Sequence, residues 1–241
     1  MVNSHINSLG KKDEVRVMFN SIARNYDLLN HLLSFGIDIL WRKRLIKELK
    51  KCSPQHVIDI ATGTGDLAIM AVKKGIVKVT GVDISENMIA IGNGKIQNQK
   101  LQDKIDLTSG DAECLPFDND SFDAAIVSFG VRNFENLDNG LLDIKRVLKE
   151  GGEFLILEFS QPDNKIFKIF YKFYSSFIIP LIGKIISKDS NAYNYLPESI
   201  SKFPYGDEMI EILEKNGYCN CRYIPLTFQI ATIYIGTKKS E

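Results

Sequence analysis

A short strand, a glycine turn and a helix follow one another near residue 60, and this unit limits the folds open to the chain. Residues 57–60 predict a buried strand, the turn 63–65 reads Gly-Thr-Gly, and a helix is expected over 67–74. Further strands are predicted at 77–82, 105–108, 123–128 and 153–159, with helices at 85–99, which Ser85 caps, and at 137–149, which Gly151-Gly152 ends. Because strands that alternate with helices form parallel sheets covered on both faces, we expect an α/β fold.

The segments around this core predict helices before it and an insertion after it. Helices are expected over 14–33, where apolar residues recur at helical spacing, and over 38–51, with Asp38 as the N-cap. Residues 164–203 are mostly helical by pattern and rich in aromatic residues, and a helix at 207–216 and strands at 218–223 and 229–237 follow. We expect a single domain over 1–241 with four parts: N-terminal helices at 1–52, a core at 53–160, an inserted helical cap at 161–205, and a C-terminal helix with two strands at 206–241.

Composition and charge argue against several classes of protein. Lysine and arginine together number 30, as do aspartate and glutamate, so the chain lacks the basic excess typical of proteins that bind nucleic acid. The 4 cysteines and 3 histidines show no zinc-ligand spacing, and no metal is expected. The N-terminus has no apolar signal segment, and the longest uncharged run of the most apolar stretch, 173–183, is shorter than the roughly 20 residues that cross a bilayer. We therefore expect a cytoplasmic protein.

Acidic residues stand at the ends of three successive predicted strands. Asp59 lies at the end of the first strand, Asp83 follows the second, and Asp111-Ala112 follows the third. Gly63 and Gly65 allow a ligand to approach the backbone closely, and the helix after them offers free N–H groups. Because ligands bind at the carboxyl ends of the strands in such sheets, these residues are expected to line a ligand site.

The charge around the glycine turn narrows the kind of ligand. The pattern Gly63-x-Gly65-x-x-Ala68 also fits the dinucleotide fingerprint, so a nicotinamide cofactor stays open. Asp59 and Asp66, however, place carboxylates on both sides of the turn, which disfavours a pyrophosphate and favours a ligand with positive charge. S-adenosylmethionine, with its sulfonium and amino groups, meets this requirement. Its ribose hydroxyls would then donate to the carboxylate that follows the second strand.

These residues resemble the class I S-adenosylmethionine-dependent methyltransferases, and further motifs resemble a narrower family, the quinone-biosynthesis C-methyltransferases. The resemblance covers roughly residues 15–238. The motifs that carry it, in chain order, are FNSIARNYDLLN (19–30), LSFGID (33–38), Trp41-Arg42, SFGVRN (128–133), LEFS (157–160) and YNYLPESI (193–200). The chain departs from the family at Asp111, where many members carry asparagine, and at Pro197.

The resemblance implies a Rossmann-like fold with a mostly parallel seven-stranded sheet, in which residues 53–160 bind the cofactor. It implies that S-adenosylmethionine contacts the positions of Thr64, Asp83, Asp111-Ala112 and Ser128. The implied substrate is demethylmenaquinol, a prenylated quinol, and in many members also the ubiquinol precursor. The implied reaction transfers a methyl group to a ring carbon.

Such a reaction sets two tasks for the protein. It must hold the ring carbon about 3 Å from the methyl group, and it must stabilise or help to form the phenolate that activates this carbon. Arg132 and Asn133, just beyond the fourth predicted strand, are the candidates, and Arg132 suits electrostatic stabilisation because it stays protonated. A scaffold salt bridge is the alternative role for Arg132. Tyr195 and Glu158 are further candidates for contact with the quinol hydroxyls.

The aromatic insertion leaves several alternatives open. Aromatic residues beside lysines at 164–186 suit a transient contact with a membrane surface, and they equally suit a buried cap or a homodimer contact. Methyl transfer to another small molecule, hydride transfer with a nicotinamide cofactor, and binding without catalysis are the other functions that the glycine turn allows.

Overall fold

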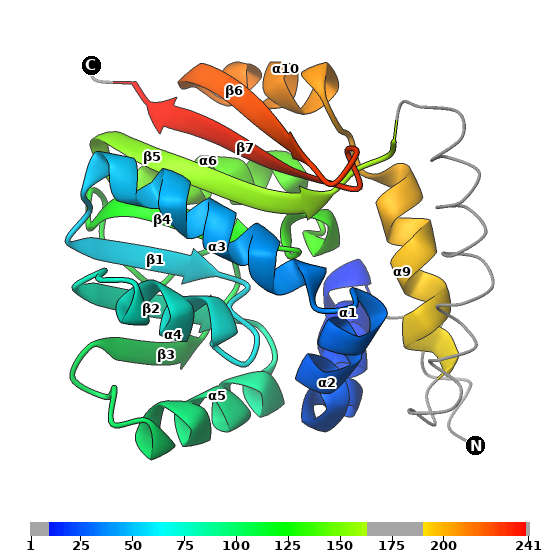
Figure 1. Cartoon of the computed structure of the whole chain (residues 1–241). Helices are drawn as coiled ribbons and strands as arrows, with labels where there is room; N and C mark the ends of the chain where they lie inside the picture. Colours follow the sequence, from blue (N-terminus) through cyan, green and yellow to red (C-terminus); the bar gives the residue numbers. More distant parts are fainter. Residues whose placement is uncertain (1–9, 163–189, 240–241) are drawn as a thin grey trace.

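A seven-stranded sheet forms the centre of the computed structural model, which describes residues 10–162 and 190–239 (Figure 1). The strands are β1 His56–Ile60, β2 Lys78–Asp83, β3 Ile105–Ser109, β4 Phe122–Ser128, β5 Leu148–Phe159, β6 Tyr218–Leu226 and β7 Ala231–Lys238. They lie in the order β3-β2-β1-β4-β5-β7-β6. Strands β1 to β5 are parallel, whereas β7 is antiparallel to both β5 and β6. The predicted α/β fold with a mostly parallel sheet is confirmed.

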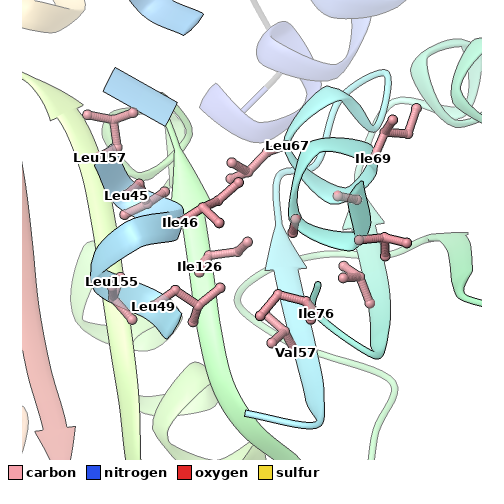
Figure 2. Packing of buried hydrophobic residues seen from close by; sticks show 14 of the residues in the cluster. Leu45, Ile46, Leu49, Val57, Leu67, Ile69, Ile76, Ile126, Leu155 and Leu157 are labelled. Carbon is pink, nitrogen blue, oxygen red and sulfur yellow. The ribbon is translucent and has the colours of Figure 1, made fainter. Parts of the chain in front are cut away.

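Helices cover both faces of this sheet. One face carries α3 Ile37–Leu49, α4 Asp66–Lys73 and α5 Glu86–Asn98, and the other carries α6 Leu137–Val147 and α10 Asp207–Lys215. Successive residues of a strand point to opposite faces, so Val57 of β1 packs in the first core and Ile58 in the second. Figure 2 shows the first core, in which side chains of α3 lie over those of β4 and β5: Leu45, Ile46, Leu49, Ile126, Leu155 and Leu157. Each fully buried leucine contributes about 1.5–3 kcal/mol to folding.

Three further helices lie beside the carboxyl ends of the parallel strands: α1 Lys11–Ile22, α2 Tyr26–Leu33 and α9 Ser190–Lys202 (Figure 1). The prediction of one continuous helix over 14–33 is wrong, because a 3₁₀ turn at Ala23–Asn25 separates α1 from α2. Asparagine favours turns over helix interiors, which accounts for a break at this point. The two short helices together form a wall over the strand ends.

Two other local predictions need correction. Asp38 is not the N-cap of α3, because Gly36 precedes the helix in a left-handed conformation (φ 73°) and Asp38 lies buried in the first turn. Gly151-Gly152 does not separate a helix from a strand but lies inside β5, beside an irregular register between β4 and β5. A Cβ at Gly152 would come within 3.0 Å of the Asp123 carbonyl oxygen, so only glycine fits this close approach. The cap of α5 by Ser85 is confirmed, since its Oγ accepts from Met88 N–H.

The predicted inserted cap is described only in part. Its last segment is α9, whereas the aromatic run at 164–186 lies outside the described residues. Within the described residues, no helix is long and apolar enough to span a bilayer. The division of the chain into four parts stays a prediction.

Candidate active site

The turn between β1 and α4 ties the first two strands together at their carboxyl ends. Gly63 and Gly65 have φ angles of 58° and 76°, a region that glycine adopts without steric cost. The Gly63 N–H donates to Asp83 Oδ2 at 2.8 Å, and the Ser85 N–H donates to Asp83 Oδ1 at 2.8 Å. Burial raises the pKa of Asp83, while these backbone hydrogen bonds oppose the rise. The carboxylate is therefore held in place at the end of β2.

A cavity of about 80 Å³, here called the edge pocket, opens at the carboxyl ends of β1 to β4. Its lining includes the following residues that the sequence singled out: Gly63, Asp83, Asp111, Ala112, Ser128 and Asn133. The Ser128 Oγ atom is buried and has no hydrogen-bond partner among the described residues. Because an unsatisfied buried hydroxyl costs about 1–3 kcal/mol, a polar ligand that bonds to it would be favoured.

Helix α1 closes one side of the edge pocket through two lysines. Lys12 Nζ pairs with Asp111 Oδ2 at 2.5 Å, and this hydrogen bond raises the pKa of Lys12. Lys11 Nζ donates to the carbonyl oxygens of Phe134 and Arg132. Asp111, one of the positions expected to contact the cofactor, is therefore already paired with α1, an element that the sequence did not link to it.

A smaller cavity of about 20 Å³, here called the loop pocket, is lined in part by the glycine turn. Asp59 and Thr64 line this cavity rather than the edge pocket, and Gly65 lines neither. Burial raises the pKa of Asp59 to about 7, and the Thr62 hydroxyl donates to its Oδ2 at 2.6 Å. The Thr64 hydroxyl donates to Asp27 Oδ1 at 2.6 Å, so it already has a partner from α2.

The largest of these cavities, about 260 Å³, is here called the apolar cavity. Its walls come from α1, α2, α3, α9, the segment after β4, the end of β5 and the turn between β6 and β7. Most of its lining is apolar, as in Met18, Leu29, Trp41, Phe159, Leu196 and Ile230. Arg132 and Tyr195 add polar groups to this lining. An apolar space with a few fixed polar groups is the usual form of a small-molecule site.

Arg132 is held by a buried ion pair. Its Nη1 lies 2.7 Å from Glu158 Oε1 and also donates to the Phe129 carbonyl oxygen at 2.5 Å. The guanidinium lies 5.4 Å from the centre of the Phe159 ring. Burial raises the pKa of Glu158, and the Arg132 charge opposes the rise. The Arg132 Nε atom is buried without a hydrogen-bond partner in the described structure. The scaffold salt bridge considered for Arg132 is thus present, and one of its N–H groups still lacks an acceptor.

A hydrogen bond joins the edge pocket to the apolar cavity. The Tyr195 hydroxyl, on the side of the apolar cavity, donates to Asn133 Oδ1 at 3.0 Å, and Asn133 lines the edge pocket. Burial raises the pKa of Tyr195. Phe19, Tyr26 and Phe129 line both cavities. Two ligands bound in the two cavities would therefore share one aromatic wall.

Tyr26 is the main residue of the site whose position the sequence did not indicate. It lines the edge pocket, the loop pocket and the apolar cavity, and burial raises its pKa. In the sequence it belongs to an apolar helical stripe, where an aromatic residue suggests ordinary core packing. The only indication of its role in the sequence was its hydroxyl group, a polar group within that apolar stripe.

Comparisons with known proteins identify the family of this chain. The model of the ubiE/COQ5 methyltransferase family matches residues 7–238. The chain belongs to this family. A demethylmenaquinone methyltransferase of Bacteroides fragilis is 43% identical over 98% of this chain and 97% of its own length. A second one, from Porphyromonas gingivalis, is 43% identical over 95% of this chain and 94% of its own. A ubiquinone/menaquinone biosynthesis C-methyltransferase of a Geobacter species is 42% identical over 95% of this chain and 97% of its own.

Solved structures agree with the fold. The [4+2]-cyclase SpnF superposes with a TM-score of 0.70 at 15% identity, over 97% of this chain and 98% of its own. A Thermotoga maritima protein described as an S-adenosylmethionine-dependent methyltransferase, possible histamine N-methyltransferase, gives a TM-score of 0.65 at 17% identity, over 92% of this chain and 99% of its own. At these identities the likeness concerns the fold alone, and the predicted Rossmann-like class I methyltransferase fold is confirmed.

Proposed function

We propose that this protein transfers a methyl group from S-adenosylmethionine to a ring carbon of demethylmenaquinol and so forms menaquinol. The observation that carries the proposal is the pair of adjacent cavities, one edged by carboxylates and one apolar, which share an aromatic wall. Relatives named for this reaction match nearly the whole chain. A prenylated quinol supplies the apolar surface that the larger cavity would cover.

The residues of the edge pocket and the loop pocket suit S-adenosylmethionine, which supplies a methyl group on a positively charged sulfur. Asp83 would accept from the ribose hydroxyls, and Asp111 with Ala112 would meet the adenine. The partnerless hydroxyl of Ser128 is available to the ligand, and Asp59 adds a carboxyl group that suits its ammonium group. A nicotinamide dinucleotide would instead bring a pyrophosphate to this acidic turn.

The residues of the apolar cavity suit the stabilisation of a phenolate. Ionisation of the quinol hydroxyl raises the electron density on the neighbouring ring carbon, so the reduced quinol is the form that can react. Arg132 carries its positive charge into the wall of this cavity, where the low dielectric strengthens its interaction with an anion. Asn133 and Tyr195, which bond to each other between the two cavities, would orient the quinol ring toward the methyl group.

The assay that tests this function combines the purified protein with S-adenosylmethionine and reduced demethylmenaquinol. We expect menaquinol and S-adenosylhomocysteine in equal amounts, and no product from the oxidised quinone. A ubiquinol precursor that lacks the ring methyl group tests the second activity that the names of the Geobacter relatives suggest. Calorimetric titration with NADH serves as the control for the alternative cofactor, and binding of NADH without binding of S-adenosylmethionine would refute the proposal.

The prenyl tail of such a substrate lies in a bilayer, so we also propose that the protein is cytoplasmic and makes transient contact with the membrane surface. Sedimentation with liposomes that contain demethylmenaquinol tests this contact, and protein that stays in the supernatant would contradict it. A homodimer is the remaining proposal from the sequence, and analytical ultracentrifugation tests it.

A further inference from the structure

Polar side chains lead from the apolar cavity to the protein surface through α2 and α3. Asp38 lines the cavity, and only 4% of its side chain is exposed. His31 Nδ1 lies 2.9 Å from Asp38 Oδ2, and 37% of the His31 side chain is exposed. Ser34 Oγ donates to the other carboxylate oxygen of Asp38 at 2.6 Å. One short hydrogen bond therefore connects a buried cavity wall with a side chain that reaches water.

Charged groups from three helices face this Asp38–His31 pair. His31 Nε2 lies 3.8 Å from Asp66 Oδ2 of α4, and Asp66 also pairs with Lys95 of α5 at 2.5 Å. Arg42 of α3 lies 3.8 Å from Asp38 and 3.6 Å from Asp66. Arg42 lines the apolar cavity, and its buried Nε atom has no hydrogen-bond partner within the described residues. This wall of the cavity therefore carries both a carboxylate and an unsatisfied donor.

We propose that Asp38 accepts the hydroxyl proton of the quinol and that His31 passes this proton to water, an inference that rests on the proposed function. The O–H bond breaks, the proton binds a carboxylate oxygen of Asp38, and the electron pair stays on the phenolate oxygen. After methyl transfer the ring carbon releases its hydrogen as a proton and the oxygen regains one. The net product is the proton on Asp38, which leaves through the imidazole ring of His31. The protein neither gains nor loses an electron in this sequence.

A purely structural role for Asp38 makes a different prediction. The carboxylate lies in the first turn of α3, where Gly36 provides no side-chain cap, and its bonds to His31 and Ser34 also stabilise this turn. Loss of such a role would lower the free energy of unfolding and would reduce the rate of methylation equally for all substrates. Loss of a proton acceptor would reduce this rate less for a substrate whose hydroxyl ionises more readily.

The test compares Asp38→Asn and His31→Gln with the wild type on demethylmenaquinol and on a chlorinated analogue with a more acidic hydroxyl. We expect Asp38→Asn to lower kcat about 100-fold on the natural quinol, with unchanged affinity for S-adenosylmethionine, and to recover most of this loss on the acidic analogue. We expect His31→Gln to lower kcat less, and added imidazole to restore part of it. Asp106→Asn, an exposed residue of β3, and His56→Gln, at the other end of β1, are the matched controls.

The outcomes separate this inference from the proposed function. A wild type that does not methylate the quinol overturns both. An active wild type whose Asp38→Asn variant keeps its kcat, or loses it equally on both quinols, overturns the proton path alone. If Asp38→Asn does not fold, the His31→Gln variant provides the test, because the His31 side chain is partly exposed. A His31→Gln variant that keeps the wild-type pH profile of kcat and does not respond to imidazole overturns the proton path.

Discussion

Asp59 is a carboxyl group that the fold keeps out of water, and this gives a pH dependence of stability. Its pKa rises from 3.8 to about 7, so the folded protein holds a proton that the unfolded chain releases. This contribution to the free energy of unfolding is complete below about pH 3.8 and is lost as the pH rises through about 7. Relative to Asp59→Asn, the wild type should lose on the order of 4 kcal/mol between these limits.

Urea unfolding of both proteins at pH 5 and pH 8 measures the part of this loss that falls above pH 5, about 3 kcal/mol. Asp106→Asn, which removes an exposed carboxylate, is the control and should follow the wild type. Stability curves of the wild type and Asp59→Asn that stay parallel across this range would show that the buried carboxyl is ionised throughout.

Arg132 and Glu158 form a buried ion pair, in which each charged side chain needs the other as its partner. The side chains are 6% and 0% exposed, so Arg132→Met leaves an unpaired buried carboxylate. We expect this variant to lose about 3–5 kcal/mol of stability, and Arg132→Met/Glu158→Gln to regain most of it. Both variants should bind S-adenosylmethionine normally and turn over slowly, because the positive charge of the cavity wall is gone.

Denaturant unfolding and calorimetry of the two variants check this prediction. The double variant is the decisive sample, because it separates the loss of charge from the loss of folding. Cofactor binding that collapses together with turnover in the folded double variant would contradict the role of Arg132 in the apolar cavity.

At the scale of elements, α1 has the geometry of a lid over the edge pocket. It is fastened by Lys12 to Asp111, by Lys11 to backbone carbonyls, and by Asn20 Oδ1, which accepts from the Ser85 hydroxyl at 2.7 Å. Lys12→Met should accelerate dissociation of S-adenosylmethionine by up to about fivefold, because exposed ion pairs contribute at most about 1 kcal/mol. Stopped-flow fluorescence and hydrogen exchange of α1 measure the effect.

The control for this variant lies in the same helix. Arg16 pairs with Asp13 on α1 and does not line the edge pocket, so Arg16→Met should leave the dissociation rate unchanged. Equal rates for the wild type and Lys12→Met would show that the ion pair does not hold the ligand.

The elements of the sheet could be predicted from the sequence, whereas the position of α1 and α2 over the strand ends could not. Strand positions follow from short apolar runs, and their ends place acids such as Asp83 and Asp111 at one edge by topology alone. The break at Ala23–Asn25 leaves the helical spacing of the apolar residues uninterrupted, and the irregular register beside Gly152 involves its close approach to Asp123 of β4. The place of Tyr26 in the site could not be predicted either, because it follows from the direction of two helices rather than from its neighbours in sequence.

At the scale of the whole molecule, we expect the shared aromatic wall to couple the binding of the two ligands. Phe19, Tyr26 and Phe129 line both cavities, so a ligand that orders these rings in one cavity prepares them for the other. We expect S-adenosylhomocysteine to tighten the binding of demethylmenaquinol, and the quinol to tighten the binding of the nucleotide by the same factor. Calorimetric titration of each ligand with and without the other measures both factors, and independent binding would contradict the coupling.

The apolar cavity joins distant parts of the chain, since Trp41 Nε1 of α3 donates to Thr227 Oγ1 in the turn between β6 and β7, 186 residues later. Thr227 and Ile230 belong to the cavity wall, whereas the lining of the edge pocket ends at Glu135. During synthesis on the ribosome, all the residues that line the edge pocket are therefore made well before the wall of the apolar cavity is complete. A nascent chain would acquire affinity for the methyl donor first, and it would become able to enclose a lipid only when its last hairpin emerges.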